Sequence, residues 1–231
     1  MSKPRSIDKI IEEQVKRWEA SRRERTAEHR HEPVISISRL PGCGGRSLGQ
    51  ELARRLKFDF FDREILRQVA ESAHLSEAIL ATVDDKVRPM VEEWVESLFM
   101  ERYLSGDYFR HLSKILMAIA QHGRAVILGH GAGFILKPEL CLRVGLVAPL
   151  EERVATVARR DELSREEAKR RVIQRESERR AFVQRHFHAN LLDSVHYDLV
   201  LNTASLGQEV ALAAILAAWE GKRHQAPGAA Q

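Results

Sequence analysis

The 231-residue chain has little of what marks secreted, membrane-spanning or strongly polyanion-binding proteins. Its two cysteines, Cys43 and Cys141, are too few for a disulfide framework. No apolar run approaches about 18 residues, so we expect no transmembrane helix. Residues 1–30 are charged throughout and lack the apolar core of a signal peptide. We therefore expect a cytoplasmic protein with no membrane partner.

The chain also has little excess charge of one sign. Its 37 Lys and Arg residues are nearly balanced by 33 Asp and Glu residues, which gives a formal net charge of +4. The arginine-rich stretch 159–185 contains acidic side chains throughout, and this argues against a nucleic-acid-binding stripe. With 44% apolar residues, the length suits one domain with a sizeable core.

What the chain does have begins with an N-terminal helical pattern over residues 6–30. Apolar residues recur there at helical spacing: Ile7, Ile10, Ile11, Val15 and Trp18. This stripe either packs on the chain's own domain or forms a homodimer contact. We expect an N-terminal helical arm (1–32), a main domain (33–221) and a flexible polar tail (222–231).

Strand-like and helix-like segments alternate over the main domain. The predicted strands are Val34–Ser38, Phe58–Phe61, Ala125–Gly129, Leu140–Val147 and Tyr197–Leu201. The predicted helices are Ser47–Leu56, Arg63–Ser72, Met90–Glu101, Tyr108–Gln121, Leu150–Arg159, Ser164–Arg175 and Gly207–Gly221. Near-continuous apolar runs are typical of strands covered on both faces. The alternation predicts an α/β fold in which parallel strands are joined by right-handed crossovers.

The most informative segment is a glycine loop, residues 39–47, directly after the first predicted strand: Arg39-Leu40-Pro41-Gly42-Cys43-Gly44-Gly45-Arg46-Ser47. A strand, a glycine turn and a helix in this order direct backbone N–H groups and a helix N-terminus at a phosphate. The P-loop pattern G-x-x-x-x-G-K-[ST] works in this way. Here its first glycine position holds Arg39 and its lysine position holds Gly45.

Two neighbouring residues offer substitutes for what the loop lacks. Arg46 supplies a positive charge one position late, and Ser47 supplies a hydroxyl for Mg²⁺, also one position late. We predict that a nucleotide's phosphates bind the following residues: Arg39, Gly42, Cys43, Gly44, Gly45, Arg46 and Ser47. Whether such a loop supports catalysis stays open at this point.

The loop and several later segments resemble the cytidylate kinase-like family, relatives of the P-loop nucleoside-monophosphate kinases. The resemblance covers residues 34 to 220. It rests on the Ile-Ser-Arg and Gly-x-Gly-Gly residues of the loop, together with Phe58–Asp62, Ala125–Gly129, Leu150–Arg153 and Tyr197–Thr203 in that order.

The resemblance implies a three-layer P-loop kinase-like fold with a five-stranded parallel sheet of order 2-3-1-4-5. It implies an enzyme that uses ATP and Mg²⁺ to phosphorylate a nucleoside monophosphate, CMP-like, or another small acceptor. Asp62 would face the acceptor. Arg175 and Arg180 would close over the transferring phosphoryl group from a helical lid at about 161–190, where planar guanidinium groups suit phosphate oxygens.

The sequence departs from the cytidylate kinases on the acceptor side. Those kinases have an Arg-Asp pair after the third strand, whereas this chain has His130 and Gly131. Arg67 falls one residue from the expected arginine. CMP itself is therefore poorly supported, although Arg67, Gly129 and His130 remain candidates for acceptor binding. His130 would bond a phosphate or base, or merely form the turn, and the weak dinucleotide-like pattern Gly129–Gly133 is better interpreted as close backbone approach.

Two hypotheses follow for the function. In the first, the protein is an ATP-dependent kinase in which Arg46, Arg175 and Arg180 are catalytic. In the second, the missing lysine makes it a catalytically impaired nucleotide-binding sensor or partner protein. The segment 161–190 has few large apolar residues before Phe182, so we expect it to pack weakly until ligands bind.

Overall fold

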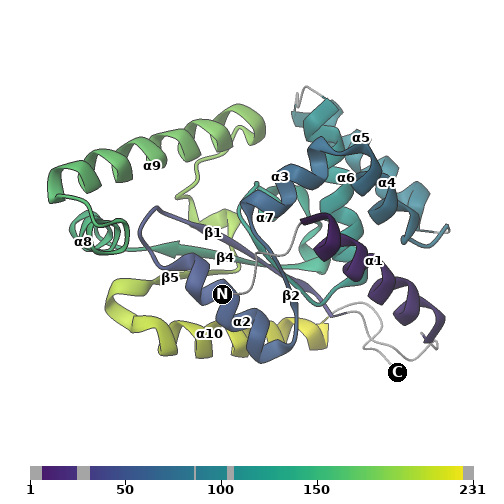
Figure 1. Ribbon diagram of the computed structural model, residues 1–231, viewed down its shortest axis with the longest axis horizontal. Coiled ribbons are helices and arrows are strands. Elements are labelled where there is room, and N and C mark those ends of the chain that lie inside the picture. The colour runs from purple at the N-terminus through teal and green to yellow at the C-terminus, as the bar shows by residue number, and fades with distance from the viewer. Residues whose placement is uncertain (1–6, 25–31, 86, 103–106, 226–231) are drawn as a thin grey trace.

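The computed structural model describes residues 7–24, 32–85, 87–102 and 107–225. The protein has a central five-stranded sheet of order β2-β3-β1-β4-β5, in which all neighbouring strands are parallel (Figure 1). The strands are β1 (Val34–Arg39), β2 (Asp59–Phe61), β3 (Ala125–Leu128), β4 (Cys141–Val147) and β5 (Leu199–Asn202). The predicted fold class and strand order are confirmed.

The central strands are apolar because both of their faces are covered. Ile35 of β1 pairs with Val126 of β3 on one side and with Leu142 of β4 on the other, and all three side chains are buried. Burying one such side chain contributes about 1.5–3 kcal/mol. The carboxyl ends of β1 and β3 therefore form a firmly packed edge, which is where open α/β sheets position ligands.

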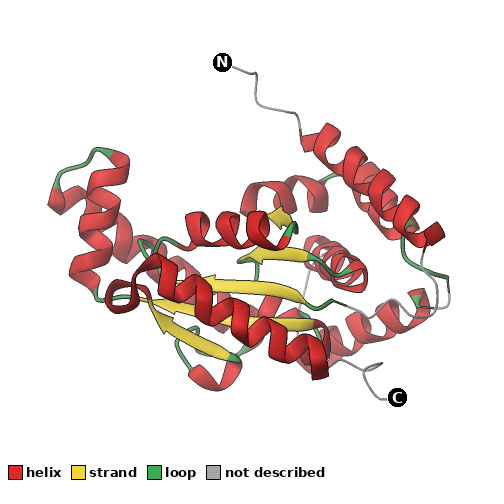
Figure 2. Ribbon diagram, turned by 90° about the horizontal axis from the view of Figure 1, so that it is seen from below, coloured by secondary structure: helices red, strands yellow, loops and turns green. Residues whose placement is uncertain are grey.

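Helices cover both faces of this sheet. The helices α2 (Gly45–Leu56) and α10 (Thr203–Gln225) lie on one face, which Figure 2 shows from below. On the other face lie α6 (Asp107–His122) and the short α7 (Ala132–Ile135). The helices outside α6 are α3 (Arg63–Glu71), α4 (Ala73–Ala81) and α5 (Arg88–Arg102), and two 3₁₀ turns lie at Pro138–Leu140 and Ser194–His196.

The N-terminal helix α1 (Ile7–Glu24) packs within its own chain, against the edge strand β2 and helices α4 and α6. Ile11 and Trp18 are buried, and the Trp18 ring stacks on His122 at 4.3 Å between centroids. Gln14 donates to the Asp59 carboxylate at 2.6 Å, and Arg17 pairs with the same group at 3.0 Å. Ile11, Val15 and Trp18 of the apolar stripe thus pack on the chain's own domain. The remainder of the predicted arm, at 1–6 and 25–31, lies outside the described residues.

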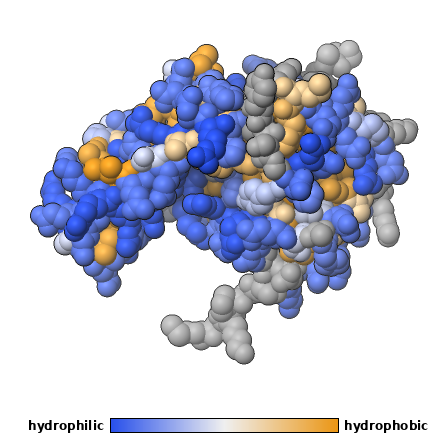
Figure 3. Space-filling model, turned by 90° about the horizontal axis from the view of Figure 1, so that it is seen from above, coloured by the Kyte–Doolittle hydropathy of each residue, from blue (hydrophilic) through white to orange (hydrophobic). Residues whose placement is uncertain are grey.

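Helices α8 (Leu150–Asp161) and α9 (Arg165–Phe187) form an arm that projects from one end of the sheet (Figure 1). We call them the α8–α9 arm. A capping box between Ser164 and Glu167 starts α9, which continues well beyond the predicted end at Arg175. Seen from above, this end of the molecule is mostly hydrophilic (Figure 3).

The C-terminus and the surface add two further facts. Helix α10 is broken at Gly207, whose φ is 72°, and it continues to Gln225, so part of the predicted tail is helical. Residues 226–231 lie outside the described part. Among the helices that the structure describes, none is long and apolar enough to cross a membrane.

Candidate phosphate-binding site

The glycine loop joins the end of β1 to the start of α2 at the middle of the sheet. Gly42 and Gly44 have φ values of 91° and 68°, a region that side chains with a Cβ rarely adopt. A Cβ on Gly42 would also lie 2.5 Å from the carbonyl oxygen of Arg153 on α8. The loop therefore needs glycine both for its backbone conformation and for its close approach to the α8–α9 arm.

The N-terminus of α2 has the features of an anion site. Its N-cap is Gly44, which provides no side-chain cap, and no acidic residue lies in the first turn. The N–H groups of the first turn and the helix dipole are thus left to a negatively charged ligand. Ser47 Oγ donates to the Gly44 carbonyl at 2.8 Å.

A cavity of about 930 Å³ opens directly in front of this helix end. Its lining includes all nine residues of the glycine loop, the start of α3, the turn after β3 and the inner side of the α8–α9 arm. The structure thus brings together around one cavity nearly all the residues that the sequence nominates: Arg39, Gly42, Cys43, Gly44, Gly45, Arg46, Ser47, Asp62, Arg67, Gly129, His130 and Arg175. Arg180 is absent from this lining.

Arg46 does not reach into the loop as the sequence argument supposed. Its guanidinium pairs with the Asp62 carboxylate at 2.6 Å, and its side chain is 67% exposed whereas that of Asp62 is 7% exposed. Asp62 Oδ1 also accepts from the backbone N–H groups of Glu64 and Ile65, which caps α3. The two residues predicted to serve donor and acceptor are therefore bound to each other in the free protein.

Cys43, in the middle of the loop, is a buried free thiol. Burial raises its pKa to about 11, so the sulfur stays protonated at neutral pH. Its carbonyl accepts from Thr203 Oγ1 at 3.2 Å, which ties the loop to the start of α10. The side chain of Cys43 thus fills space beneath the loop.

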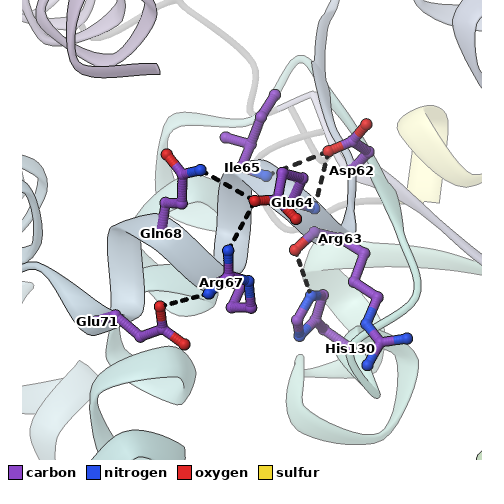
Figure 4. Close-up of polar contacts among 8 residues, drawn as sticks. All are labelled: Asp62, Arg63, Glu64, Ile65, Arg67, Gln68, Glu71 and His130. Carbon is purple, nitrogen blue, oxygen red and sulfur yellow. Dashed lines mark hydrogen bonds and ion pairs between the residues drawn. The ribbon is translucent and has the colours of Figure 1, made fainter. Parts of the chain in front are cut away.

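The turn after β3 forms another wall of the cavity. Gly129, His130 and Gly131 have φ values of 88°, 58° and 71°, so three successive residues are left-handed. His130 Nε2 lies 3.0 Å from the carbonyl oxygen of Arg63, which joins this turn to the start of α3 (Figure 4). Burial lowers the pKa of His130, so the ring is neutral at neutral pH. The histidine thus has a structural contact as well as a place in the cavity wall.

Arg67 lies one turn further along α3. Its guanidinium pairs with Glu71 and Glu64, each at 2.7 Å (Figure 4). These hydrogen bonds raise the pKa of Arg67 and help to lower that of Glu64. Because two carboxylates already neutralise Arg67, this arginine is less available to an anionic ligand than its neighbour Arg63.

The arginines of α9 divide by helical face. Arg175 and Arg179 are four residues apart, share one face and line the cavity. Arg179 Nη1 donates to the carbonyl oxygen of Arg39 at 2.7 Å, so α9 touches the end of β1 directly. Burial, Arg63 and Arg175 lower the pKa of Arg179 to about 10. Arg180 points elsewhere and pairs with Glu176 at 2.6 Å.

Arg153 connects the arm to the glycine loop. This buried side chain donates to the carbonyl oxygens of Ala148 at 2.9 Å and Pro41 at 3.5 Å, and it pairs with Glu176 of α9 at 2.8 Å. Burial raises the pKa of Glu176, but the hydrogen bonds from Arg180 and Arg153 outweigh it and hold the pKa below its usual range. The position of α9 is therefore linked to the position of the loop.

Arg63 and Arg179 also line the cavity, but the sequence did not lead us to nominate either of them. Arg179 had a signal, because its spacing from Arg175 places both on one helical face. Arg63 had none, since its place at the first position of α3 becomes significant only when the turn after β3 folds beside it.

A glycine loop on the central strand of a 2-3-1-4-5 parallel sheet, with a helical arm over the same sheet edge, defines a P-loop kinase-like fold. The sequence profile of the cytidylate kinase-like family matches residues 34–205. The chain therefore belongs to the cytidylate kinase-like family. No curated protein matches it.

Several solved structures are similar to the chain. An uncharacterized protein from Eubacterium ventriosum has a TM-score of 0.64 at 17% identity, covering 82% of this chain and 99% of its own. A shikimate kinase from Bacteroides thetaiotaomicron has a TM-score of 0.46 at 17% identity and covers 81% and 98% of the two chains. A gluconokinase from Sinorhizobium meliloti has a TM-score of 0.39 at 12% identity and covers 85% and 94%.

Proposed function

We propose that the protein transfers the terminal phosphoryl group of ATP to a nucleoside monophosphate, CMP-like, or to another small acceptor. The observation that carries this proposal is the cavity of about 930 Å³ at the carboxyl end of β1. It places an uncapped helix N-terminus opposite arginines from a separate helical arm. Phosphoryl transfer needs little else, because its catalysis consists mostly of positioning and of neutralising charge on the phosphate oxygens.

The donor's phosphates would bind the backbone N–H groups at Gly42, Gly44 and Gly45. Ser47 would help to hold Mg²⁺, because Ser47 Oγ donates its hydrogen to the Gly44 carbonyl and keeps its lone pairs for a cation. Among the described residues, no group of three or more acidic, histidine or cysteine side chains forms a metal site. The bound ion would screen the charge between neighbouring phosphates.

The acceptor would bind between Asp62, His130 and the lid arginines. For Asp62 to face an acceptor, Arg46 has to leave it, and a bound triphosphate offers Arg46 a stronger anion. Binding of the donor would thus free the Asp62 carboxylate for the acceptor. Arg175, with Arg179 in place of Arg180, would neutralise the transferring group from the arm.

Release of ADP across a panel of nucleoside monophosphates and small alcohols tests the proposal. We expect turnover with at least one acceptor and abolition of that turnover in Gly44→Val, which cannot keep the left-handed N-cap. Absence of ADP release with both ATP and GTP over the whole panel would contradict it.

A second candidate is a catalytically impaired nucleotide-binding sensor or partner protein. It is favoured by one observation: the lysine position holds Gly45, and Arg46 is occupied by Asp62. In this case calorimetry would detect ATP binding while stoichiometric enzyme produces no ADP. Turnover that disappears in Arg46→Ala would exclude this candidate.

A further inference from the structure

The cavity holds an unusual excess of positive charge. Eight arginines line it, against the two carboxylates of Asp62 and Glu178. Three of the eight are neutralised by acidic side chains: Arg46 by Asp62, Arg67 by Glu64 and Glu71, and Arg160 by Asp161. Within the described residues, no carboxylate pairs with the other five, which are Arg39, Arg63, Arg159, Arg175 and Arg179.

Arg39 has the most distinctive surroundings of these five. It is the last residue of β1 and stands where the P-loop pattern has its first glycine. Its guanidinium lies over the end of β3, because a Cβ on Gly129 would be 2.4 Å from Arg39 Nη1. Gly129 therefore leaves the space that this guanidinium occupies. The stem of the same side chain lies against Gly45, whose Cβ would be 3.1 Å from Arg39 Cγ.

Arg39 thus lies beside Gly45, the position at which a P-loop has its lysine. Gly45 leaves room for the aliphatic part of the Arg39 side chain. That side chain extends from the loop to the turn after β3, where its guanidinium lies beside Gly129. In the free protein Arg46, the cation that the sequence suggested, is paired with Asp62. Arg39 is the positive group that the loop itself leaves without an acidic partner.

Two more arginines lie close to Arg39. Arg179 reaches it from α9 and donates to the Arg39 carbonyl, and Arg63 reaches it from α3 beside His130 (Figure 4). Burial, Arg179 and Arg63 lower the pKa of Arg39 to about 9. The Asp62 carboxylate raises the pKa of Arg39, but by less than Arg179 and Arg63 lower it. An anion between the three guanidinium groups would relieve the remaining repulsion.

We propose that Arg39, Arg63 and Arg179 form a site for a doubly charged phosphate group, and that Arg39 supplies the cation that the missing lysine would have supplied. This proposal rests on the proposed phosphotransferase function. We call these residues the three-arginine site. They come from β1, α3 and α9, so the site is complete only when the arm lies over the sheet edge.

The phosphate that binds there is the terminal phosphate of the donor. In the transfer, the bond from the terminal phosphorus to its bridging oxygen breaks and the electron pair leaves with ADP. A bond to an oxygen of the acceptor forms, and in a nucleoside monophosphate this is an oxygen of its phosphate. The guanidinium groups neither gain nor lose a proton, and they hold the equatorial oxygens throughout the step.

The test compares ATP and ADP by calorimetry on the wild-type protein, Arg39→Met and the control Arg185→Met. Arg185 is exposed on α9 and does not line the cavity. Because only ATP has the terminal phosphate, we expect Arg39→Met to weaken ATP binding by about 10-fold to 100-fold and ADP binding by less than about 3-fold. Equal effects on both nucleotides, or none, would overturn the proposal.

Thermal melting without ligand separates this role from a structural one. Removing a crowded, unpaired charge should leave the melting temperature of Arg39→Met at or above that of the wild type. A marked loss of stability would show that Arg39 holds the loop in place, which would contradict the proposal. Should Arg39→Met fail to fold, Arg63→Met carries the same comparison of ATP with ADP, since Arg63 is exposed.

Two further outcomes distinguish the sources of the phosphate. If Arg39→Met weakens the binding of CMP but not of ATP, the site binds the acceptor's phosphate. The proposal that Arg39 takes the place of the P-loop lysine is then wrong. If the wild type binds neither nucleotide, the proposed function fails, and inorganic tripolyphosphate then tests the site alone. Greater thermal stabilisation of the wild type than of Arg39→Met by tripolyphosphate would support the three-arginine site, and equal stabilisation would overturn it.

Discussion

The two ends of helix α9 are held in different ways. Its first half packs on α8, through a small cluster in which Ala168 and Val172 meet Val154 and Val157. Its last turns belong to the main core, where Phe187 stacks on Phe134 at 5.0 Å between centroids and Val183 is buried. One helix thus joins a small separate cluster to the body of the protein.

The difference suggests that the two halves of α9 have different roles. The anchored end fixes where the helix leaves the core, while the outer half has little apolar contact to keep it in one position. Arg175 and Arg179 lie between these two ends, over the cavity. Such an arrangement suits a lid that opens for substrates and returns to one place.

Among variants of α9, we expect the largest effect on catalysis. Arg179→Met should lower kcat/KM by about 10³-fold, because it removes a guanidinium from the transferring phosphate. Arg180→Met, the adjacent control, should change kcat/KM by less than about 3-fold, because its surface pair with Glu176 contributes little. Steady-state kinetics of both variants measure this. The reverse ranking would restore Arg180 as the lid arginine.

The next effect is on stability. Phe187→Ala should lower the free energy of unfolding by about 3 kcal/mol, because it leaves a cavity against Phe134 and Gly131. Val172→Ala, in the outer cluster, should cost about 1 kcal/mol or less, because the outer cluster is small and can yield locally. Urea denaturation of the two variants gives the comparison. Equal losses would mean that both ends of α9 unfold with the core.

The ion pair between Arg153 of α8 and Glu176 of α9 should make a smaller, pH-dependent contribution to stability. Glu176 has a pKa below its usual range in the folded protein, so its contribution to stability is present above its unfolded pKa and is lost as the pH falls through the folded one. Glu176→Gln should cost about 2 kcal/mol at pH 7 by breaking the pair with Arg153. The difference between variant and wild type should shrink in acid. A difference independent of pH would exclude the carboxylate as its source.

The smallest effect concerns local opening. Amides near residues 170–176 should exchange at least about 10-fold faster than those of β3 in the free protein, and ATP should slow them. Hydrogen exchange followed by mass spectrometry resolves these segments. Protection equal to that of β3, unchanged by ATP, would make the α8–α9 arm a static surface.

The sheet could be predicted from the sequence because its strands carry strong local signals. Val34–Arg39 and Cys141–Val147 are apolar runs followed by glycine or proline turns, and the resemblance supplied the strand order. Helix α4 was missed, since nine mixed residues after a Ser72 cap give little periodicity. The length of α9 was underestimated because its second half is amphipathic over a different surface from its first.

The site was predictable only in part, for a physical reason. The residues of the glycine loop are contiguous, so their grouping is visible in the sequence. The pairing of Arg46 with Asp62, and the position of Arg39 over Gly129, depend on contacts between separate strands. Local patterns carry no information about which of several arginines meets an acidic partner across the fold.

The packing of α1 has a practical consequence for making shorter versions of the protein. Strand β2 is a sheet edge of only three residues, and α1 covers it through Trp18 and the contacts to Asp59. A truncation that begins at Pro33 keeps the whole family-matched region, yet it uncovers this edge and the apolar surface beside it. Exposed edges pair with other chains. We expect such a truncated protein to aggregate during purification, even though it retains every residue of the cavity.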